Sequence, residues 1–195
     1  MSGTADRDPG VTPPRAAGPA TDRSAAGSPT DLPALVTSLR LRLELITPDE
    51  AADMVAGRGR PAWDPAYPRE DDRFAASLVK PGARSPGWGP RHVVRAFDGL
   101  VVGSIGFYGP PEAAADATPE VEVGYGLVAS ARGHGAATEA LRALLVETDR
   151  LGVRVRASVV PENAASLRVL TKCGFTELRG SNEAGELVLA RPLPT

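Results

Sequence analysis

The chain has 195 residues, of which 42% are hydrophobic, so it can form one domain with a closed core and a tail. Its formal net charge of -2 argues against nucleic acid or an anionic membrane as a partner. The only cysteine, Cys173, excludes an internal disulfide and a cysteine-rich metal site, and we expect it to be a small core residue.

No apolar run approaches the length of a membrane span, and the N-terminus lacks the apolar stretch of a signal peptide. We therefore expect a cytoplasmic protein. Residues 1–31 are rich in Pro, Gly, Ala, Ser, Thr and Asp, with Val11 as the only large aliphatic residue between Met1 and Leu32. Such a segment buries too little to offset its chain entropy, which predicts a disordered tail before a domain at residues 38–195.

The domain begins with residues 39–45, whose strict alternation predicts a half-buried strand. Thr47 then offers an N-cap, Pro48 a first helical position and Glu50 a capping-box carboxylate, which together predict a short helix ending at Val55. A second helix and a hairpin are expected next, the latter because Asp-Gly is a strong two-residue turn signal. Their residues are 69–79 for the helix, 91–97 and 100–107 for the strands, and Asp98-Gly99 for the turn.

A strand, a glycine loop and a helix follow one another in the centre of the chain. Residues 120–128 place valine at alternate positions, which is typical of a strand with two unlike faces. Apolar residues recur at helical spacing from Ala137 to Leu151. Gly133 and Gly135 allow positive φ and a close ligand, and the first amides of a helix lack partners. With Arg132 beside them, these features predict a phosphate or pyrophosphate site.

The last elements predicted are a strand at 153–159, a helix that Asn163 caps and Gly174 ends, and strands at 175–178 and 187–190. The order of elements is β, α, α, β, β, β, α, β, α, β, β, without an internal repeat. This order predicts a mixed α/β (α+β) domain.

Two motifs resemble those of a known family. The loop Arg132-Gly133-His134-Gly135-Ala136-Ala137 resembles the coenzyme A pyrophosphate loop, Arg/Gln-x-x-Gly-x-Gly/Ala, of the GNAT N-acetyltransferases. Residues 163–175 are similar to the Asn-x-x-Ser … Gly-Phe signature of the RimJ/RimL-like branch, which acetylates protein N-termini and other amines. The resemblance extends from about Leu39 to the C-terminus. It implies a GNAT-like fold, mostly antiparallel with flanking helices, and acetyl-CoA as cosubstrate.

The resemblance also implies which residues hold the cofactor. The pyrophosphate would lie on Arg132, Gly133, His134, Gly135, Ala136 and Ala137, and the pantetheine on the amides of Leu127 and Val128 and on Asn163. His134 is expected near the anion, rather than as a base. The other histidine, His92, lies far from His134 in sequence, and no obvious cluster of acidic ligands accompanies either one. We therefore expect no catalytic metal.

Acetyl transfer from a thioester to an amine needs a base that removes the amine proton. Glu120 and Glu122 share one face of the 120–128 strand, so either could face the cleft. We favour Glu122, because Glu-Val-Gly-Tyr matches the Glu-x-Gly-Tyr pattern of the RimJ/RimL-like branch; the alternative is a solvated edge carboxylate. Gly124 and Gly126 indicate a bulge or a close backbone approach, which would leave a slot for the pantetheine arm.

The sequence differs from much of the family at the residue that would protonate the departing thiolate. Many GNAT enzymes place a tyrosine four residues before the glycine of Gly-Phe, and Leu170 stands there. In the RimJ/RimL-like branch a serine three residues after the asparagine can take the role, which would be Ser166. Its alternative is a helix hydroxyl that bonds back to its own backbone.

Together these patterns predict an acetyl-CoA-dependent N-acetyltransferase that acts by direct attack of a primary amine in a ternary complex. The alternative is a catalytically weak module that senses acetyl-CoA. The acceptor stays open between a protein N-terminus and a small-molecule amine, although Asp64, Asp71 and Asp72 hint at a cation. Trp63 and Trp88 could line its pocket or cover the core. A homodimer is also left open.

Overall fold

The computed structural model describes residues 31–194. The predicted disordered tail therefore lies outside the described residues, apart from Asp31. The strands are β1 (Leu35–Thr37), β2 (Leu41–Leu45), β3 (Pro90–Arg95), β4 (Val101–Phe107), β5 (Glu112–Ala113), β6 (Pro119–Leu127), β7 (Arg154–Val159), β8 (Glu177–Ser181) and β9 (Leu187–Arg191). The helices are α1 (Pro48–Val55), α2 (Glu70–Ser77), α3 (Ala136–Arg150) and α4 (Ala164–Lys172), with 3-10 turns at Pro86–Trp88 and Ala129–Ala131.

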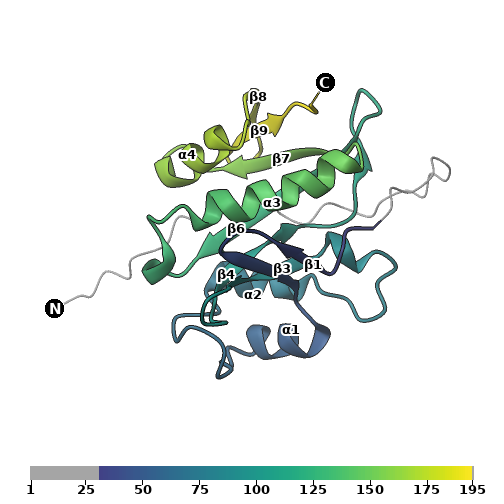
Figure 1. Ribbon diagram of the computed structural model, residues 1–195. Helices are drawn as coiled ribbons and strands as arrows, with labels where there is room; N and C mark the ends of the chain where they lie inside the picture. Colours follow the sequence, from purple (N-terminus) through teal and green to yellow (C-terminus); the bar gives the residue numbers. More distant parts are fainter. Residues whose placement is uncertain (1–30, 195) are drawn as a thin grey trace.

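The strands form one sheet in the order β1-β2-β3-β4-β6-β7-β9-β8, and β5 pairs with the start of β6. Neighbouring strands are antiparallel except β6 and β7, which are parallel because α3 crosses between them. In Figure 1, α3 crosses in front of the sheet, whereas α1 and α2 lie below and behind it. This mostly antiparallel mixed sheet with flanking helices confirms the predicted fold class.

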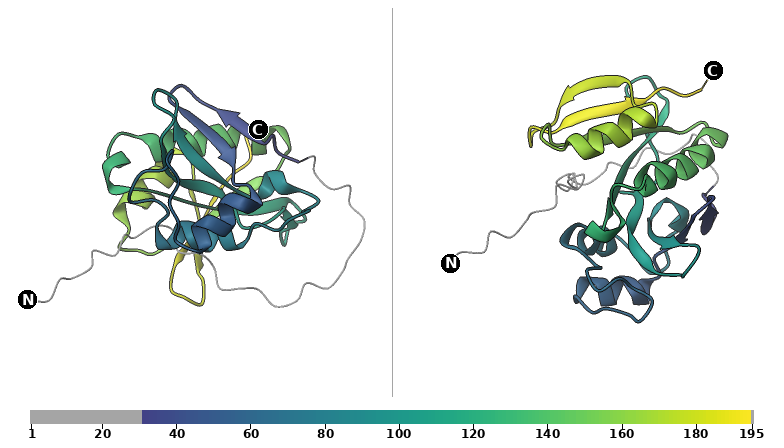
Figure 2. Two further views of the ribbon diagram at one scale, coloured as in Figure 1. Left: turned by 90° about the horizontal axis from the view of Figure 1, so that it is seen from below. Right: turned by 60° about the vertical axis from the view of Figure 1, so that its left-hand side comes forward.

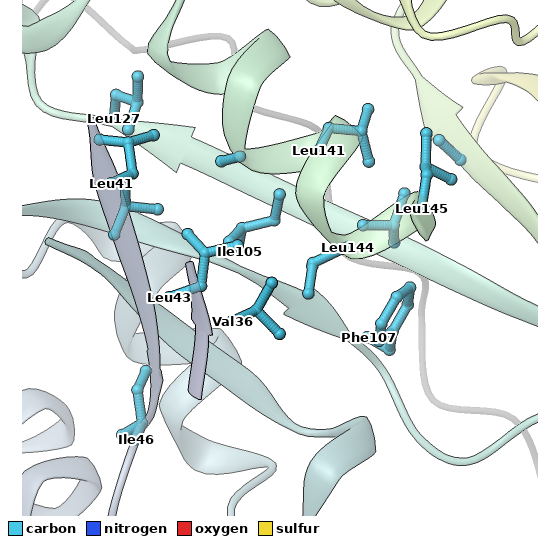
Figure 3. Close-up of a cluster of buried hydrophobic side chains, with 14 of the residues drawn as sticks. Val36, Leu41, Leu43, Ile46, Ile105, Phe107, Leu127, Leu141, Leu144 and Leu145 are labelled. Atoms are coloured by element: carbon cyan, nitrogen blue, oxygen red, sulfur yellow. The ribbon is translucent and has the colours of Figure 1, made fainter. Parts of the chain in front are cut away.

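The main core lies between α3 and the sheet. The apolar stripe of α3 faces side chains of β2, β4 and β6 (Figure 3): Leu141, Leu144 and Leu145 on the helix, and Leu43, Ile105, Phe107 and Leu127 on the strands. Each such side chain contributes roughly 1.5–3 kcal/mol when fully buried. Because side chains alternate along a strand, Ile105 and Phe107 of β4 and the odd-numbered residues of β6 face α3, whereas Ser104 and the even-numbered residues of β6 face α2.

Local signals explain most element boundaries. At α1 the capping box is complete: the Glu50 N–H donates to Thr47 Oγ1 over 3.3 Å, and the Thr47 N–H donates to Glu50 Oε2 over 2.9 Å. Gly99 has φ 73° in the hairpin connection, which spans residues 96–99 and not the two predicted, because the Arg95 N–H donates to the Leu100 carbonyl and the Gly99 N–H to the Arg95 carbonyl. Asn163 caps α4, because its Oδ1 accepts the Ser166 N–H over 2.9 Å.

Three boundaries differ from the sequence-based expectation. The short strands β1 and β5 were not predicted, because runs of three and two residues show no periodicity and are defined by their distant partners. The strand expected at 175–178 begins instead at Glu177, since Phe175 is buried in the core after Gly174. Among the described residues, no helix has the length and apolar character needed to cross a membrane.

Candidate functional site

The sheet opens between β6 and β7. The two strands pair over three positions only, ending at Glu122 opposite Arg156, yet β6 continues to Leu127 and β7 to Val159. The right-hand view in Figure 2 shows β7, α4, β8 and β9 leaning away from the rest of the sheet. The pairing of β4 with β6 stays in register from Leu127 to Val123, so Gly124 and Gly126 mark no bulge. The slot predicted from the glycines is nevertheless there.

The N–H groups of β6 divide between its two edges. The Tyr108 N–H donates to the Glu122 carbonyl, and the Val128 N–H donates to the Val102 carbonyl over 2.9 Å. In an antiparallel pair every second residue bonds the same neighbour, so the N–H of Leu127 points away from β4, toward the opening. The Val128 amide is used within the sheet and does not reach it.

The glycine loop has the backbone shape that an anion site needs. Gly133 and Gly135 have φ of 81° and 79°, values that L side chains rarely adopt. The first i→i−4 bond at the start of α3 runs from the Glu139 N–H to the Gly135 carbonyl over 3.0 Å. The N–H groups of residues 136–138 therefore have no partner within the helix and carry the positive end of its dipole.

A cleft of about 420 Å³ opens in front of this loop, between β6, α3 and α4. Most of the predicted cofactor residues border it: Leu127, Arg132, Gly133, Gly135, Ala136, Ala137 and Asn163. Arg168 and Lys172 on α4 border it too, and neither forms an ion pair within residues 31–194. Sequence reasoning missed these two cations, although their four-residue spacing just after the Asn-x-x-Ser motif places them on one helix face.

His134 and Val128 are the two predicted cofactor residues that do not border this cleft. The His134 carbonyl accepts a hydrogen bond from Arg40 Nη2 over 3.1 Å. Its side chain borders a separate surface pocket beside Leu39 and Phe97. The loop thus presents its glycines to the cleft and its histidine to the opposite side.

Ser166 and Tyr125 meet at the inner end of the cleft. Ser166 is 7% exposed and borders the cleft, and no hydrogen bond joins its Oγ to the backbone of the described residues. The Tyr125 hydroxyl, from β6, donates to the Ser166 carbonyl over 3.3 Å. Burial raises the pKa of Tyr125 above its ordinary value, so this hydroxyl stays protonated. Leu170 is fully buried in the core and donates nothing.

Two carboxylates on β6 have different surroundings. Glu120 accepts hydrogen bonds from Arg154 Nε and from Arg179 Nη1, each over 2.6 Å, so two guanidinium groups neutralise it. Both partners belong to a surface ion-pair network at the paired end of β6 and β7. Glu120 is therefore a structural residue.

Glu122 lies at the point where β6 and β7 separate. Its Oε1 accepts a hydrogen bond from Ser158 Oγ over 2.7 Å, and its Oε2 accepts one from Arg156 Nε over 3.1 Å. Glu122 is 8% exposed, whereas the Arg156 side chain is 46% exposed and its charge is partly screened by water. Glu122 thus keeps a carboxylate at the edge of the opening.

An arginine from the start of α2 crosses to the opening. A Cβ at Gly126 would overlap the Arg69 guanidinium, which explains why this strand position carries no side chain. Arg69 Nε donates to Asp72 Oδ2 over 2.9 Å, and Ser104 Oγ donates to Asp72 Oδ1 over 2.5 Å. Asp72 is fully buried, so this network fixes the guanidinium between the cofactor cleft and the α2 face.

A tyrosine covers the other strand glycine. A Cβ at Gly124 would overlap the Tyr108 hydroxyl, so the hydroxyl end of this side chain lies directly against β6. Burial raises the pKa of Tyr108, and the charges of Glu122, Asp71 and Glu186 raise it further. The hydroxyl is therefore a neutral hydrogen-bonding group amid carboxylates.

The α2 face holds a passage and a pocket. A narrow passage of about 20 Å³ runs between α2 and β4, bordered by Arg69, Asp71, Tyr108 and Gly124. It shares Leu78, Pro90, Phe107 and Tyr108 with a pocket of about 560 Å³ whose walls are mostly apolar. Trp88 borders this pocket and packs against Phe107 with ring centroids 5.4 Å apart. Openings on both sides of β6 thus converge at its two glycines.

Comparison with known proteins agrees with this geometry. The sequence profile of the acetyltransferase (GNAT) domain matches residues 40–176. The chain belongs to the GNAT acetyltransferase family. Acetyl-CoA-dependent acetyl transfer is general to GNAT proteins, so family membership assigns acetyl-CoA to this chain as cosubstrate. No curated protein matches the sequence.

Solved structures share the GNAT fold with low sequence identity. A GnaT-family acetyltransferase from Bordetella pertussis is 23% identical with a TM-score of 0.58, covering 81% of this chain and 99% of its own. Mycobacterium smegmatis RimJ, in complex with CoA-disulfide, is 24% identical with a TM-score of 0.55, covering 80% and 86%. The microcin C7 self-immunity acetyltransferase MccE, in complex with acetyl-CoA and AMP, is 16% identical with a TM-score of 0.56, covering 79% and 93%.

Several residues singled out in the sequence are structural in this GNAT domain. Asp72 holds Arg69, and Asp64 accepts hydrogen bonds from the Ala66 N–H and from Ser130 Oγ. Trp63 is 6% exposed and packs on His92, so it covers the core. Within residues 31–194, no group of three or more His, Cys, Asp and Glu side chains is placed to hold a metal ion.

Proposed function

We propose that this GNAT protein transfers the acetyl group of acetyl-CoA to a primary amine by direct attack in a ternary complex. The observation that carries the proposal is the meeting of two openings at β6: the cofactor cleft on the α3 and α4 side and the passage on the α2 side. A thioester and an amine held in these openings would face each other across Gly124 and Gly126. Such proximity supplies much of the rate of an acyl transfer.

On the cofactor side, main-chain groups do most of the binding. The pyrophosphate lies against the free N–H groups at residues 136–138, and Arg132, Arg168 and Lys172 add positive charge. Leu127 and Asn163 hold the pantetheine by hydrogen bonds. Asn163 is the N-cap of α4 and borders the cleft, which supports this role.

Glu122 is the base in this proposal. Most alkyl amines are protonated at neutral pH, so the attacking nitrogen must first lose a proton. Glu122 lies beside the opening, and Ser158 and Arg156 fix the direction of its carboxylate. Glu122 first takes a proton from the ammonium, directly or through a water, and passes it to solvent. The neutral amine then attacks the thioester carbonyl; as the N–C bond forms, a second N–H proton passes to Glu122 and on to solvent, and the C–S bond breaks.

The departing CoA thiolate receives a proton from the Ser166 hydroxyl. The neighbouring Tyr125 hydroxyl supports this role, because it lies at the same inner end of the cleft. A thiolate is a fair leaving group, so this step contributes less than removal of the amine proton. The products are the acetamide and free CoA, and Ser166 regains its proton from water.

The acceptor in this proposal carries an apolar group next to its amine. The passage admits little more than the amine itself, and the pocket beyond it has apolar walls that include Trp88. An N-terminal residue with an apolar side chain, as in a RimJ/RimL-like acceptor, and an apolar small amine both fit this shape.

We infer a cytoplasmic enzyme, and a homodimer stays an open expectation.

A second candidate is an acetyl-CoA sensor without turnover. The observation that favours it is Leu170, which is buried where many GNAT enzymes carry their tyrosine acid. A sensor would keep the cofactor cleft and would have no use for a base at the opening, so Glu122 separates the two candidates.

The deciding experiment measures release of free CoA thiol with a panel of amines: peptides that differ in their first residue, apolar amines, polyamines and aminoglycosides. The parent protein should release thiol with apolar-flanked amines, and Ser166→Ala should be slower by roughly tenfold. Acetyl-CoA binding without thiol release across the panel would favour the sensor.

A further inference from the structure

Glu186 is a buried carboxylate that the proposed mechanism does not use. It is 1% exposed, and its Oε1 has no hydrogen-bond partner among the described residues. A buried polar atom without a partner costs free energy, and an ionised carboxylate costs more than a neutral group. A feature with such a cost calls for an explanation.

The turn between β8 and β9 holds this carboxylate in place. Asn182 Nδ2 donates to Glu186 Oε2 over 2.7 Å, while Asn182 Oδ1 accepts the N–H groups of Ala184 and Glu186, each over 3.0 Å. The Asn182 side chain therefore closes the turn and also fixes the position of Glu186 Oε2. The other oxygen, Oε1, is left without a donor.

Pairing of the strands places Glu186 near the acceptor side. Val188 in β9 lies opposite Ser158 in β7, so the two share a face, and Ser158 bonds Glu122 on that same face. Glu186 is two residues before Val188 and therefore lies on the same side. Burial raises the pKa of the Tyr108 hydroxyl on this face, and the charges of Glu122, Asp71 and Glu186 raise it further.

We propose that Glu186 is a positioning residue for the acceptor, and that its uncompensated charge holds a protonated amine beside the Tyr108 hydroxyl before the proton is removed. Tyr108 accepts an N–H of the ammonium, Glu122 takes a proton from it before attack, and Glu186 and Asp71 raise the local concentration of the cation. The acceptor class is then a basic amine that arrives as an ammonium ion. This inference rests on the proposed function.

The test compares Glu186→Gln with the parent on two acceptors of matched shape. One is a basic primary amine, which is an ammonium ion at neutral pH, and the other is the corresponding hydrazide, which is uncharged there. Glu183→Gln is the matched control, because Glu183 is an exposed carboxylate in the same turn. At an effective dielectric constant of about 20, the lost attraction corresponds to roughly a 10- to 50-fold lower kcat/KM for the ammonium acceptor.

We expect this loss to be mostly in KM of the amine, with the hydrazide and the binding of acetyl-CoA changed less than about twofold. Equal losses on both acceptors, or no loss on either, would overturn the inference while the proposed function stands. If the parent acetylates neither acceptor, the proposed function fails. Calorimetric binding of the ammonium to the CoA-loaded protein then decides the role of Glu186: weaker binding to Glu186→Gln supports it, and equal binding overturns it.

Discussion

The two sides of β6 are built by different means. The cofactor cleft uses main-chain N–H groups at residues 136–138 and exposed cations on α4, and most of its lining comes from one stretch of the chain, residues 125–172. The α2 side uses buried and half-buried side chains that lie far apart in sequence, including the Arg69–Asp72 pair, Tyr108 and Glu186. The first side depends on backbone shape, and the second depends on how several elements pack.

This difference predicts how each side responds to substitution. Main-chain groups cannot be removed by a side-chain change, so the cofactor side is damaged by altering backbone conformation or net charge. Side chains on the acceptor side are individually replaceable, and each change there should affect the acceptor and leave acetyl-CoA binding nearly intact. Four predictions test this contrast.

The largest effect is expected at Glu122. Glu122→Gln should lower turnover by roughly 100-fold or more around neutral pH, because general base catalysis typically contributes that much. Its Kd for acetyl-CoA, measured by calorimetry, should stay within about twofold. Glu120→Gln is the matched control two residues earlier on the same face, and it should keep its turnover, since Glu120 is neutralised by Arg154 and Arg179. Full activity of Glu122→Gln would disprove its role as the base.

The next effect is expected at Gly135. Gly135→Val forces a β-branched residue toward φ of 79° at the cap of α3, so the loop should change shape and acetyl-CoA affinity should fall at least about tenfold. Gly152→Val is the control, because Gly152 has φ of 66° at the other end of α3 with open space around it. The two variants should lose similar stability, and only the first should lose acetyl-CoA binding. Equal affinities would contradict an anion site at this loop.

A smaller effect is expected for the cations on α4. Arg168→Gln and Lys172→Gln should each raise the Kd of acetyl-CoA about two- to fivefold at low salt, because both are exposed and screened by water. Added salt should shrink the difference from the parent. The control is Arg150→Gln, at the far end of α3, whose side chain is 69% exposed. A salt-independent loss would point to a change in packing instead.

The smallest effect concerns pH and stability. Burial lowers the pKa of His92 below its ordinary value of about 6.5, and the Tyr67 hydroxyl lies 2.9 Å from its Nδ1. Near pH 6.5 the unfolded chain therefore binds a proton at His92 that the folded chain does not bind. The contribution of neutral His92 to the free energy of unfolding is complete above that pH and decreases as the pH falls below it. The slope is at most about 1.4 kcal/mol per pH unit.

Urea unfolding at pH 7.5 and pH 5.5 measures this loss. It should shrink in His92→Asn and persist in His134→Asn, because the second histidine is exposed in the glycine loop. The same loss in all three proteins would assign the effect to carboxylates instead. His92 is buried among side chains of other elements, as on the acceptor side, whereas His134 is exposed on the glycine loop of the cofactor side.

Much of the cofactor side could be predicted from the sequence. Gly133, Gly135, Asn163 and Ser166 border the cleft or shape its loop as the motifs indicated, since each acts within a few residues of its own helix start. Two details could not be predicted. Which way His134 points depends on Arg40, and whether the Val128 amide is free depends on β4, and both partners are distant in sequence.

On the acceptor side the sequence determined less. It marked Gly124 and Gly126 as special, but the reason for each is a side chain from elsewhere, Tyr108 and Arg69. The choice between Glu120 and Glu122 also follows from where β6 and β7 stop pairing.

By itself, the sequence determined the order of the helices and of every strand but β1 and β5, the anion loop and the family, because helix caps, glycine conformations and alternating faces are local properties of the chain. Only the tertiary structure decided that Glu120 is neutralised, that Arg69 is fixed across the opening and that Glu186 is buried without a partner for Oε1. The charge state and reach of a side chain depend on burial and on partners from other elements, and neither is written in the residues beside it.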